Sequence, residues 1–399
     1  MKIGILREEK IPLDKRVPLS PDQCVQLMKK YPKIEIYVMS SKHRCFNDYE
    51  YAKLGIPIVE DLSKCDVLFG IKEVPVNNLI PNKTYFYFSH TIKKQPYNKN
   101  LLKRMIDLRI KMVDYEVLKS SNGSRLIGFG RYAGIVGAYN ALRAFGIKKN
   151  IFNLTPAYLC KDKKEMEENL KYLNLSNQKI VLTGFGRVGM GCAEILNYAK
   201  IKEVSKEEFL YSKFDYPVFT HIDYQDYNIR IDGSDFEKND FYTQPELFTS
   251  SFMKFAQIAD IFIAGHYYAQ NSPIIITEKN LKHTDFNIDV IADISCDING
   301  PIASTIRSST INDPIYGYNL DTNKEDDFMK KNTIAVMAVD NLPCELPRDS
   351  SENFGKDLLE KIFPLLISSN SSIIKKATIC EKGELTNDFK YLYDFVYSD

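Results

Sequence analysis

Residues 179–191 read Lys-Ile-Val-Leu-Thr-Gly-Phe-Gly-Arg-Val-Gly-Met-Gly, a short apolar run that passes directly into a glycine-rich turn. After the turn, apolar side chains recur at helical spacing from Val188 to Ala199. The glycines therefore lie between a predicted strand and a predicted helix, where they allow a tight turn, a close approach of the backbone to a pyrophosphate and close packing of helix on strand. We predict a dinucleotide-binding site here rather than a merely structural turn, made by Gly184, Gly186, Arg187, Val188 and Gly189.

The glycine pattern does not decide between NAD and NADP. An acidic residue about 20 positions beyond the glycines would bind the adenosine ribose hydroxyls and favour NAD. The window from Ile201 to Leu210 contains several carboxylates but no clear strand end. On sequence alone the cofactor is NAD or NADP, with the choice open.

Short apolar runs rich in β-branched and aromatic residues alternate with amphipathic stretches of helical length along the whole chain. This alternation is typical of βαβ units and predicts an α/β fold with parallel sheets. We expect strands at 2–6, 34–38, 67–71, 84–88, 112–115, 179–183, 260–264, 289–294 and 333–339. We expect helices after Ser20-Pro21 and at 101–110, 354–367 and 386–396, a hinge in the glycine-rich passage 125–139 and a serine-rich loop at 368–372.

The composition narrows the classes of protein that are compatible with the chain. Its 399 residues suggest two domains, and 53 basic against 52 acidic residues leave a formal charge of +1, so neither nucleic acid nor a membrane is an expected partner. The apolar runs are much shorter than the roughly 20 residues of a membrane span, and the N-terminal run is too brief for a secretory signal. Eight cysteines without a Cys-x-x-Cys pair indicate reduced thiols in a cytoplasmic protein.

Two polar side chains directly follow predicted strands of the first domain. Lys72 follows the run 67–71, and His90 follows the run 85–89. Ligands of open α/β sheets bind beyond the carboxyl ends of the strands, and a desolvated lysine or a histidine at this edge can transfer protons near neutral pH. The alternative is that both residues merely terminate strands, and the sequence leaves the two interpretations open.

For four other charged residues the sequence gives weaker evidence of a functional role. Asp114 and Glu116 are two apart on a segment expected to be extended, so both carboxylates would lie on one face and could retune a neighbouring amine. Arg16 and Arg125 are isolated guanidinium groups near predicted loops, where each could bind a carboxylate or be a surface charge. The remaining histidines lack the spacing of metal ligands, and we predict no metal site.

Several longer motifs carry a resemblance to a known family. They are 15–21 (Lys-Arg-Val-Pro-Leu-Ser-Pro), 70–75 (Gly-Ile-Lys-Glu-Val-Pro), 87–95 (Tyr-Phe-Ser-His-Thr-Ile-Lys-Lys-Gln), 114–118 (Asp-Tyr-Glu-Val-Leu), 125–134 (Arg-Leu-Ile-Gly-Phe-Gly-Arg-Tyr-Ala-Gly), 265–273, 293–301 and 339–348. With these motifs the chain resembles the lysine-ketoglutarate reductase and lysine-forming saccharopine dehydrogenase family, within the alanine dehydrogenase and transhydrogenase superfamily. The resemblance extends over nearly the whole chain.

The resemblance implies two Rossmann-like, doubly wound parallel-sheet domains that face a central cleft. Residues 1–130 and 341–399 would form a substrate domain completed by C-terminal helices, and residues 131–340 would bind the dinucleotide. The implied reaction is a reversible, nicotinamide-dependent joining of L-lysine and 2-oxoglutarate into saccharopine through an imine. The partners would be these small molecules, and the sequence leaves the oligomeric state open, a homo-oligomer included.

The resemblance also implies catalytic roles. Lys72 would accept the proton of the secondary amine as hydride leaves, and His90 would act as acid and base in imine hydrolysis. Glu73 and Glu116 would tune the charge of these two groups.

The resemblance also implies residues that bind the substrate, and these residues help to choose between the possible functions. Arg16 and Arg125 would bind substrate carboxylates, of which saccharopine carries three, and Asp297 would lie near the substrate or the cofactor. An alanine-dehydrogenase-like oxidoreductase would share groups such as Lys72 and His90, but the stretch 125–134 favours the larger substrate. A nucleotide-sensing protein that had lost its chemistry would not need to keep these residues together.

Overall fold

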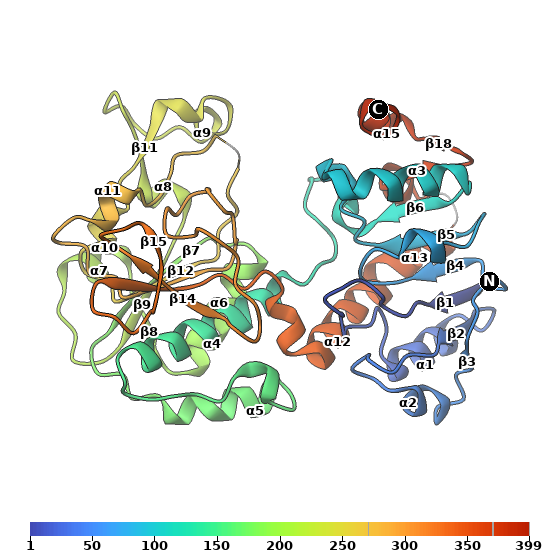
Figure 1. The fold of residues 1–399 in the computed structure, drawn as a ribbon, viewed down its shortest axis with the longest axis horizontal. Coiled ribbons are helices and arrows are strands. Elements are labelled where there is room, and N and C mark those ends of the chain that lie inside the picture. Colours follow the sequence, from blue (N-terminus) through green and yellow to red (C-terminus); the bar gives the residue numbers. More distant parts are fainter. Residues whose placement is uncertain (270, 369–370, 399) are drawn as a thin grey trace. The chain divides into compact units, whose positions relative to one another are not determined.

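The computed structural model describes residues 1–269, 271–368 and 371–398, and the chain divides into two compact units (Figure 1). One unit comprises Met1–Phe129 and Pro347–Asp399, and the other comprises Gly130–Leu346. Residues 369–370 of the expected serine-rich loop lie outside the described residues. Each unit is built around one large, mainly parallel sheet.

The sheet of the first unit has eight strands among the described residues, in the order β18-β17-β6-β5-β4-β1-β2-β3. The parallel strands are β1 (Lys2–Ile5), β2 (Glu35–Met39), β3 (Ile58–Val59), β4 (Val67–Phe69), β5 (Thr84–Tyr87) and β6 (Lys111–Asp114). At one edge, β17 (Thr378–Glu381) pairs antiparallel with β6 and with β18 (Glu384–Leu385). The helices are α1 (Pro21–Lys30), α2 (Asp48–Ala52), α3 (Lys99–Asp107), α12 (Pro347–Asp357), α13 (Phe363–Ile367), α14 (Ser372–Lys376) and α15 (Tyr393–Tyr397).

The core of the first unit forms where aromatic side chains of the central strands meet the C-terminal segment. Phe69 of β4 stacks on Phe86 of β5 with 4.7 Å between ring centroids, and it lies 5.1 Å from the ring of Phe363. All three side chains are fully buried. Burial of apolar area stabilises a fold by about 25 cal/mol per Å², so this aromatic cluster ties the C-terminal segment to the N-terminal strands.

The sheet of the second unit has the order β15-β14-β16-β13-β12-β7-β9-β8. Its parallel strands are β7 (Lys179–Thr183), β8 (Lys202–Glu203), β9 (Val218–Ile222), β12 (Ile261–Ala264), β13 (Val290–Asp293) and β16 (Thr333–Met337), and β14 (Ile315–Asn319) and β15 (Lys324–Asp326) extend it antiparallel. The helices are α4 (Gly130–Lys148), α5 (Lys163–Glu168), α6 (Arg187–Tyr198), α7 (Lys206–Tyr211), α8 (Tyr224–Tyr227), α9 (Lys238–Thr243), α10 (Met253–Ala256) and α11 (Glu278–Leu281). A separate ribbon joins β10 (Asn228–Arg230) and β11 (Phe248–Ser250).

The predicted α/β class is confirmed, and the predicted strands lie within two residues of observed ones. Ser20 is the N-cap of α1 and Pro21 its first residue, as the sequence predicts. The expectation that helices alone complete the first unit is incomplete, because β17 and β18 also extend its sheet. Within the described ranges, none of the helices combines the length and the apolar character that a bilayer span requires.

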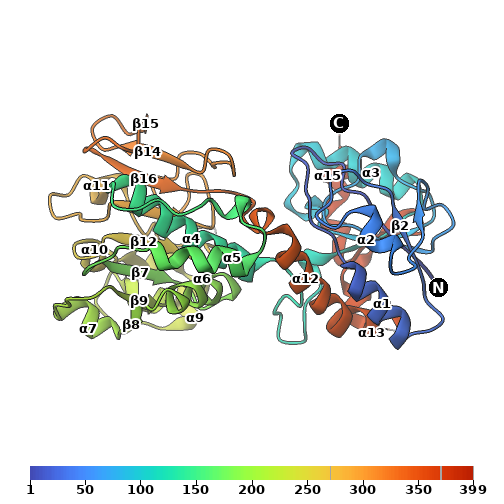
Figure 2. The ribbon, with the colours of Figure 1, turned by 90° about the horizontal axis from the view of Figure 1, so that it is seen from below.

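Glycines allow α4 and α6 of the second unit to approach to backbone contact, and the two helices lie side by side (Figure 2). A Cβ atom at Gly134 of α4 would lie 1.9 Å from the carbonyl oxygen of Val188, and one at Gly191 of α6 would lie 2.1 Å from that of Arg131. No side chain larger than a hydrogen atom fits at these positions. The approach fixes the position of α6, the helix that follows the glycine turn.

We expect Gly134→Ala to destabilise the protein more than Gly137→Ala on the same helix. A Cβ at position 134 meets backbone atoms, whereas a Cβ at position 137 meets the end of the Ile294 side chain at 2.4 Å, which can move. Overpacking costs about 1–3 kcal/mol, and more where the backbone must shift. Urea unfolding of both variants measures this, and equal losses in the free energy of unfolding would contradict the backbone contact.

Candidate active site

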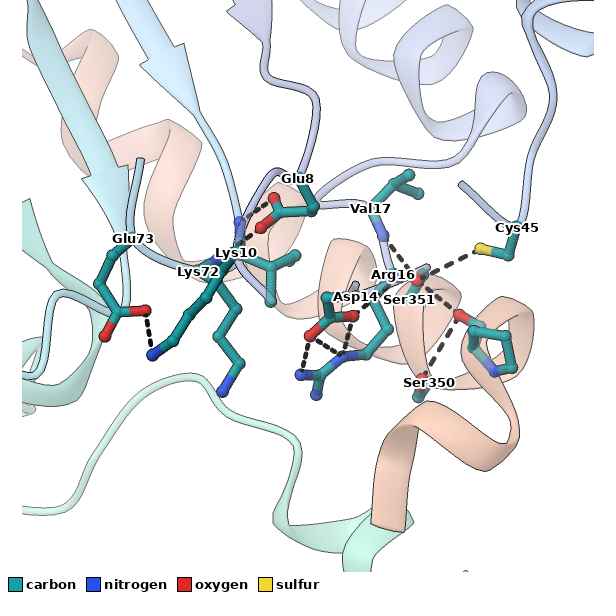
Figure 3. A network of polar contacts seen from close by, with 12 residues as sticks. Glu8, Lys10, Asp14, Arg16, Val17, Cys45, Lys72, Glu73, Ser350 and Ser351 are labelled. Atoms are coloured by element: carbon teal, nitrogen blue, oxygen red, sulfur yellow. Dashed lines mark hydrogen bonds and ion pairs between the residues drawn. The ribbon is translucent and has the colours of Figure 1, made fainter. Parts of the chain in front are cut away.

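The predicted catalytic residues of the first unit follow neighbouring strands at one edge of its sheet. Lys72 and Glu73 follow β4, His90 follows β5 and Glu116 follows β6. These three strands are adjacent and parallel, so their carboxyl ends meet at the same edge. Arg16 reaches the neighbourhood of Lys72 from the segment after β1 (Figure 3). The structure therefore brings together residues that are far apart in the sequence.

Glu73 lies at the centre of a charged chain at this edge. Its Oε1 lies 2.6 Å from His90 Nδ1, and its Oε2 accepts a hydrogen bond from Lys10 Nζ at 2.8 Å. The Glu73 side chain is only 8% exposed. Burial raises the pKa of this carboxyl, but the hydrogen bonds to His90 and Lys10 outweigh burial and lower the pKa to about 2. Glu73 is therefore an anion near neutral pH, and it orients the His90 ring.

Lys72 is partly buried and points to the same side as Lys10 and Arg16 (Figure 3). In the part of the chain that the structure describes, its amine has no hydrogen-bond or ion-pair partner. Burial lowers the pKa of Lys72 from its ordinary value, and the Arg16 guanidinium and the Lys10 amine lower it further, against the opposing effect of Asp14 and Glu73. A partly desolvated amine among other cations is suited to accept a proton.

Arg16 is paired inside the same loop. Its Nε donates to Asp14 Oδ1 at 2.9 Å, its Nη2 donates to Asp14 Oδ2 at 2.5 Å, and its guanidinium lies 4.1 Å from the centre of the Phe129 ring. Arg16 outweighs burial and holds the pKa of the Asp14 carboxyl well below its usual range. Ser351 of α12 anchors the loop by accepting the Val17 N–H at 2.9 Å (Figure 3). The prediction of an isolated guanidinium is therefore wrong for Arg16, because the loop folds Asp14 against it.

Glu116 lies between two cations. Its Oε1 is 3.4 Å from Lys93 Nζ and 3.6 Å from Arg125 Nη2, and its Oε2 is buried and accepts no hydrogen bond from any residue that the structure describes. Arg125 is half-exposed and paired, so it is not an isolated guanidinium either. The predicted extended segment is also wrong at this point, because residues 115–117 form a 3-10 turn after β6.

Asp114 connects the ends of β5 and β6. Its Oδ2 accepts hydrogen bonds from the Ser89 N–H at 3.1 Å and the Ser89 hydroxyl at 2.5 Å, and its Oδ1 accepts the Glu116 N–H at 2.7 Å. The side chain is fully buried, and burial raises its pKa to about 6. Asp114 thereby fixes the backbone on which His90 (φ 54°) and Glu116 are placed.

The predicted glycine turn lies between β7 and α6 in the second unit. Gly184 has a φ of +91°, and a Cβ at Gly189 would lie 1.7 Å from the Gly184 carbonyl oxygen, so both positions require glycine. A Cβ at Gly186 would meet nothing within 4 Å, which leaves open space beside the first residues of α6, Arg187 and Val188. An open glycine before a twelve-residue helix fits a pyrophosphate, because the helix N-terminus offers N–H donors.

The comparisons with known proteins agree with this geometry. Residues 4–136 match the family model of the alanine dehydrogenase/PNT N-terminal domain. Over 98% of the chain, the sequence is 30% identical to an alpha-aminoadipic semialdehyde synthase of Arabidopsis thaliana and 26% identical to the mitochondrial one of Mus musculus, covering 41% and 47% of those proteins. It is 25% identical, over 93% of the chain, to a saccharopine dehydrogenase (NAD(+), L-lysine-forming) of Emericella nidulans, of which it covers 94%.

Over nearly its whole length the chain is similar to proteins of the lysine-ketoglutarate reductase and saccharopine dehydrogenase family. The resemblance stated from the motifs is thus confirmed, within the alanine dehydrogenase and transhydrogenase superfamily. The chain spans less than half the length of the two synthases.

Two solved structures show the fold of the superfamily. An L-alanine dehydrogenase has a TM-score of 0.64 at 14% identity and covers 99% of this chain and 100% of its own. A transhydrogenase from Sinorhizobium meliloti has a TM-score of 0.60 at 13% identity, with 97% of this chain and 99% of its own covered. The Rossmann-like fold predicted from the sequence is confirmed by these likenesses.

The structure corrects the search for an acidic residue near the adenosine ribose. The window 201–210 holds β8 and the start of α7, and neither is the strand next to β7. That strand is β9, which ends at Ile222 and is followed by Asp223, the N-cap of α8. An additional strand and helix, β8 and α7, move the relevant strand end beyond the window, and no spacing rule shows this in a single sequence.

Asp297 lies in the second unit, whereas Lys72, His90 and both arginines lie in the first. It is exposed in the loop after β13. The loop is held by Asp293, whose Oδ1 accepts the Ser295 N–H at 3.1 Å and whose Oδ2 accepts the Thr305 hydroxyl at 2.7 Å. No group of three or more histidine, cysteine or carboxylate side chains is arranged to hold a metal ion in the described part of the chain.

Sequence reasoning missed three residues of this site, namely Glu8, Lys10 and Asp14. They lie in one segment, directly before the motif 15–21. An unusually charged run after the first strand is the signal that could have found them, since such a run lies at the carboxyl edge of the sheet.

The low pKa of Glu73 makes a testable contribution to stability. Its folded-state value, about 2, is depressed below the ordinary value of 4.5, so the stabilisation is present above pH 4.5 and is lost as the pH falls towards 2. We expect the wild-type protein to lose about 3 kcal/mol more than Glu73→Gln over this range. Urea unfolding at several pH values measures the difference, with Glu9→Gln as the control from a neighbouring segment. Parallel curves for wild type and Glu73→Gln would contradict the pairing of Glu73.

Proposed function

We propose that the chain catalyses the reversible, nicotinamide-dependent interconversion of saccharopine with L-lysine and 2-oxoglutarate. The observation that carries this proposal is the placement of the Lys72 amine beside the His90–Glu73 pair at one sheet edge, in a chain similar to this family. The names of the relatives, alpha-aminoadipic semialdehyde synthase and saccharopine dehydrogenase, support the same reaction.

In the proposed mechanism, Lys72 accepts the proton of the secondary amine of saccharopine. A nicotinamide dinucleotide held at the glycine turn would supply the hydride acceptor for the carbon next to that nitrogen, so that the substrate would become an imine. His90 then takes a proton from water as the water attacks the imine carbon, and it passes this proton to the nitrogen, which gives a carbinolamine. It next takes the proton of the carbinolamine hydroxyl and passes it to the leaving nitrogen as the carbon–nitrogen bond breaks and the carbonyl forms. The products are the amine of lysine and the carbonyl of 2-oxoglutarate.

The charged neighbours have supporting roles in this proposal. Glu73 stabilises the protonated His90 ring through their 2.6 Å contact, and Glu116 offsets the cations that surround it. We assign Arg125, which is half-exposed, to a carboxylate of the substrate, since a guanidinium binds a carboxylate with two parallel hydrogen bonds. Arg16, whose Nε and Nη2 already donate to Asp14, would attract a second substrate carboxylate by its charge.

The second unit would bind the dinucleotide, and the first unit would be the substrate domain. The bounds expected from the resemblance, 1–130 and 341–399, differ from those of the first unit at residue 130 and at residues 341–346. We assign the pyrophosphate to Gly184, Gly186, Arg187, Val188 and Gly189, on the support of the open glycine turn. Asp297 would lie near the substrate or the cofactor.

We further infer a compartment. All eight cysteines are free, which supports a reducing compartment such as the cytoplasm. Relatives from Mus musculus, Rattus norvegicus and Bos taurus are named mitochondrial. Subcellular fractionation therefore has to distinguish the cytoplasm from mitochondria. The assembly state stays open, a homo-oligomer included, and light scattering measures it.

The proposed reaction is tested by the absorbance of the reduced nicotinamide. We expect oxidation of NADH or NADPH that requires lysine and 2-oxoglutarate together, and a loss of about 10²- to 10⁴-fold in kcat for Lys72→Met. Lys53→Met, an exposed change in the same unit, serves as the control. Turnover with pyruvate and ammonium instead would point to an alanine-dehydrogenase-like reaction, and dinucleotide binding without any turnover would point to a sensor.

We infer NAD as the preferred cofactor, on the support of Asp223. The Asp223 carboxylate follows β9, the neighbour of the glycine-turn strand, and accepts the Tyr224 N–H at 2.9 Å. An acidic residue at this strand end binds the ribose hydroxyls and repels a 2′-phosphate.

For Asp223→Ser, we expect the ratio of kcat/KM for NADH to that for NADPH to fall by about tenfold or more, the equivalent of one lost interaction of about 1.4 kcal/mol. Asp215→Asn, an exposed change before β9, should leave the ratio unchanged. A wild-type preference for NADPH would overturn the assignment of Asp223.

A further inference from the structure

We propose that Glu8 is a positioning residue for Lys72, because its carboxyl group fixes the backbone from which the Lys72 side chain enters the site. The proposal deepens the function argued above and rests on it, since it names the group that holds the candidate base. The Glu8 carboxyl group contacts the main chain of Lys72, and it acts on the Lys72 side chain through that main chain.

The contacts of Glu8 are specific. Its Oε1 accepts the Ile71 N–H at 2.7 Å, and its Oε2 accepts the Lys72 N–H at 2.8 Å (Figure 3). Each carboxylate oxygen thus takes one of two consecutive backbone donors. Two consecutive N–H groups of an extended strand point in opposite directions, so the chain must turn at this point for both to reach one carboxyl group.

The ladder of hydrogen bonds between neighbouring strands does not provide acceptors for the N–H groups of Ile71 and Lys72. The ladder between β1 and β4 ends where the Leu6 N–H bonds the Phe69 carbonyl at 2.8 Å, and the Gly70 N–H turns to the Phe86 carbonyl at 2.9 Å. The next two N–H groups have left the ladder, and an unsatisfied buried donor costs about 1–3 kcal/mol. Glu8 supplies the acceptors and so determines where the strand ends.

The direction of the Lys72 side chain depends on this turn. Its amine lies among four charged groups, those of Lys10, Asp14, Arg16 and Glu73, which together set its charge state. A shift of the backbone at 71–72 would move the amine relative to all four and expose it to water. Lys72 would then titrate closer to an ordinary lysine.

Glu8 itself is placed in an unusual environment. Burial and the nearby Asp14 carboxylate raise its pKa to about 8, while the two backbone N–H groups and Arg16 act in the opposite direction. The phenol of Tyr115 also faces this carboxyl. A carboxyl group whose charged form is so costly to bury indicates a constraint on this turn that an apolar side chain cannot meet.

Glu9 offers a matched control in the same segment. Its carboxyl accepts hydrogen bonds from Arg7 Nε at 3.0 Å and Asn78 Nδ2 at 2.7 Å, and its side chain is 23% exposed. None of these contacts reaches the backbone at 71–72. Glu9→Gln therefore changes the same chemical group without changing the support of Lys72.

The test is competitive acetylation of the full chain with acetic anhydride, followed residue by residue with mass spectrometry across a pH series, together with steady-state kinetics. We expect Lys72 of Glu8→Ala to titrate at higher pH than Lys72 of wild type, so that less of it is labelled near neutral pH, where a larger fraction of the amine is protonated. We expect kcat to fall by about 10- to 100-fold, with the KM values for lysine and 2-oxoglutarate little changed, as for a misplaced catalytic group. Glu8→Gln should be intermediate, because its amide oxygen still accepts one N–H, and Glu9→Gln should match wild type.

The outcomes separate the two proposals. If wild type lacks lysine-dependent turnover, the proposed function fails, but the labelling of Lys72 still tests the role of Glu8. If Glu8→Ala does not fold, Glu8→Gln, which keeps the volume of the side chain, carries the test. An unchanged titration of Lys72 in folded Glu8→Gln and Glu8→Ala would overturn the role of Glu8.

Discussion

Backbone N–H groups that leave a β-ladder need new acceptors, and buried or half-buried carboxylates supply them throughout this chain. Glu8 accepts two such groups after β4, Asp114 accepts one after β5 and another after β6, and Asp293 accepts those of the loop after β13. Each of the three carboxylates lies next to a residue of the candidate site. Because an unsatisfied buried donor costs about as much as a typical destabilising mutation, these contacts fix where each strand ends and how the next side chain leaves the sheet.

Other carboxylates set the electrostatics of the first unit. Buried anions are stable only when they are paired or hydrogen-bonded, and Asp14, Glu73 and Glu116 each meet a cation. Most cations of the edge are consumed by these pairs. The Lys72 amine lies among them without a counterion of its own in the described residues. A proton acceptor follows from this imbalance, since burial and neighbouring cations both disfavour its charged form.

Local patterns were sufficient to predict the elements that carry this chemistry. The run 179–183 and the glycines after it combine a strand, a turn and a helix in one continuous segment, and the structure has β7 and α6 there. Lys72 and His90 were predicted at strand ends because apolar runs end directly before them. The ion pairs between charged side chains could not be predicted from such local patterns. Arg16 and Asp14, or Glu116 and Arg125, are brought together by loops whose path depends on α12 and on the turn after β6, and neither feature has a sequence period.

The proposed adenosine-binding part of the cofactor site was also not predictable from local sequence patterns. Counting residues from the glycines assumes that the second strand follows the helix at once, but β8 and α7 come first and only then the strand that pairs with β7. β9 reads Val-Phe-Thr-His-Ile, and its polar residues interrupt the apolar run that marks the other strands. The place of a strand in a Rossmann-like sheet is defined by the strands that pair with it. The number of residues between two strands predicts this place only where no other helix or strand lies between them in the sequence. Asp223 can therefore be assigned a role from the strand order, whereas the carboxylates of the window 201–210 are nearer in sequence but lie around a strand at the edge of the sheet.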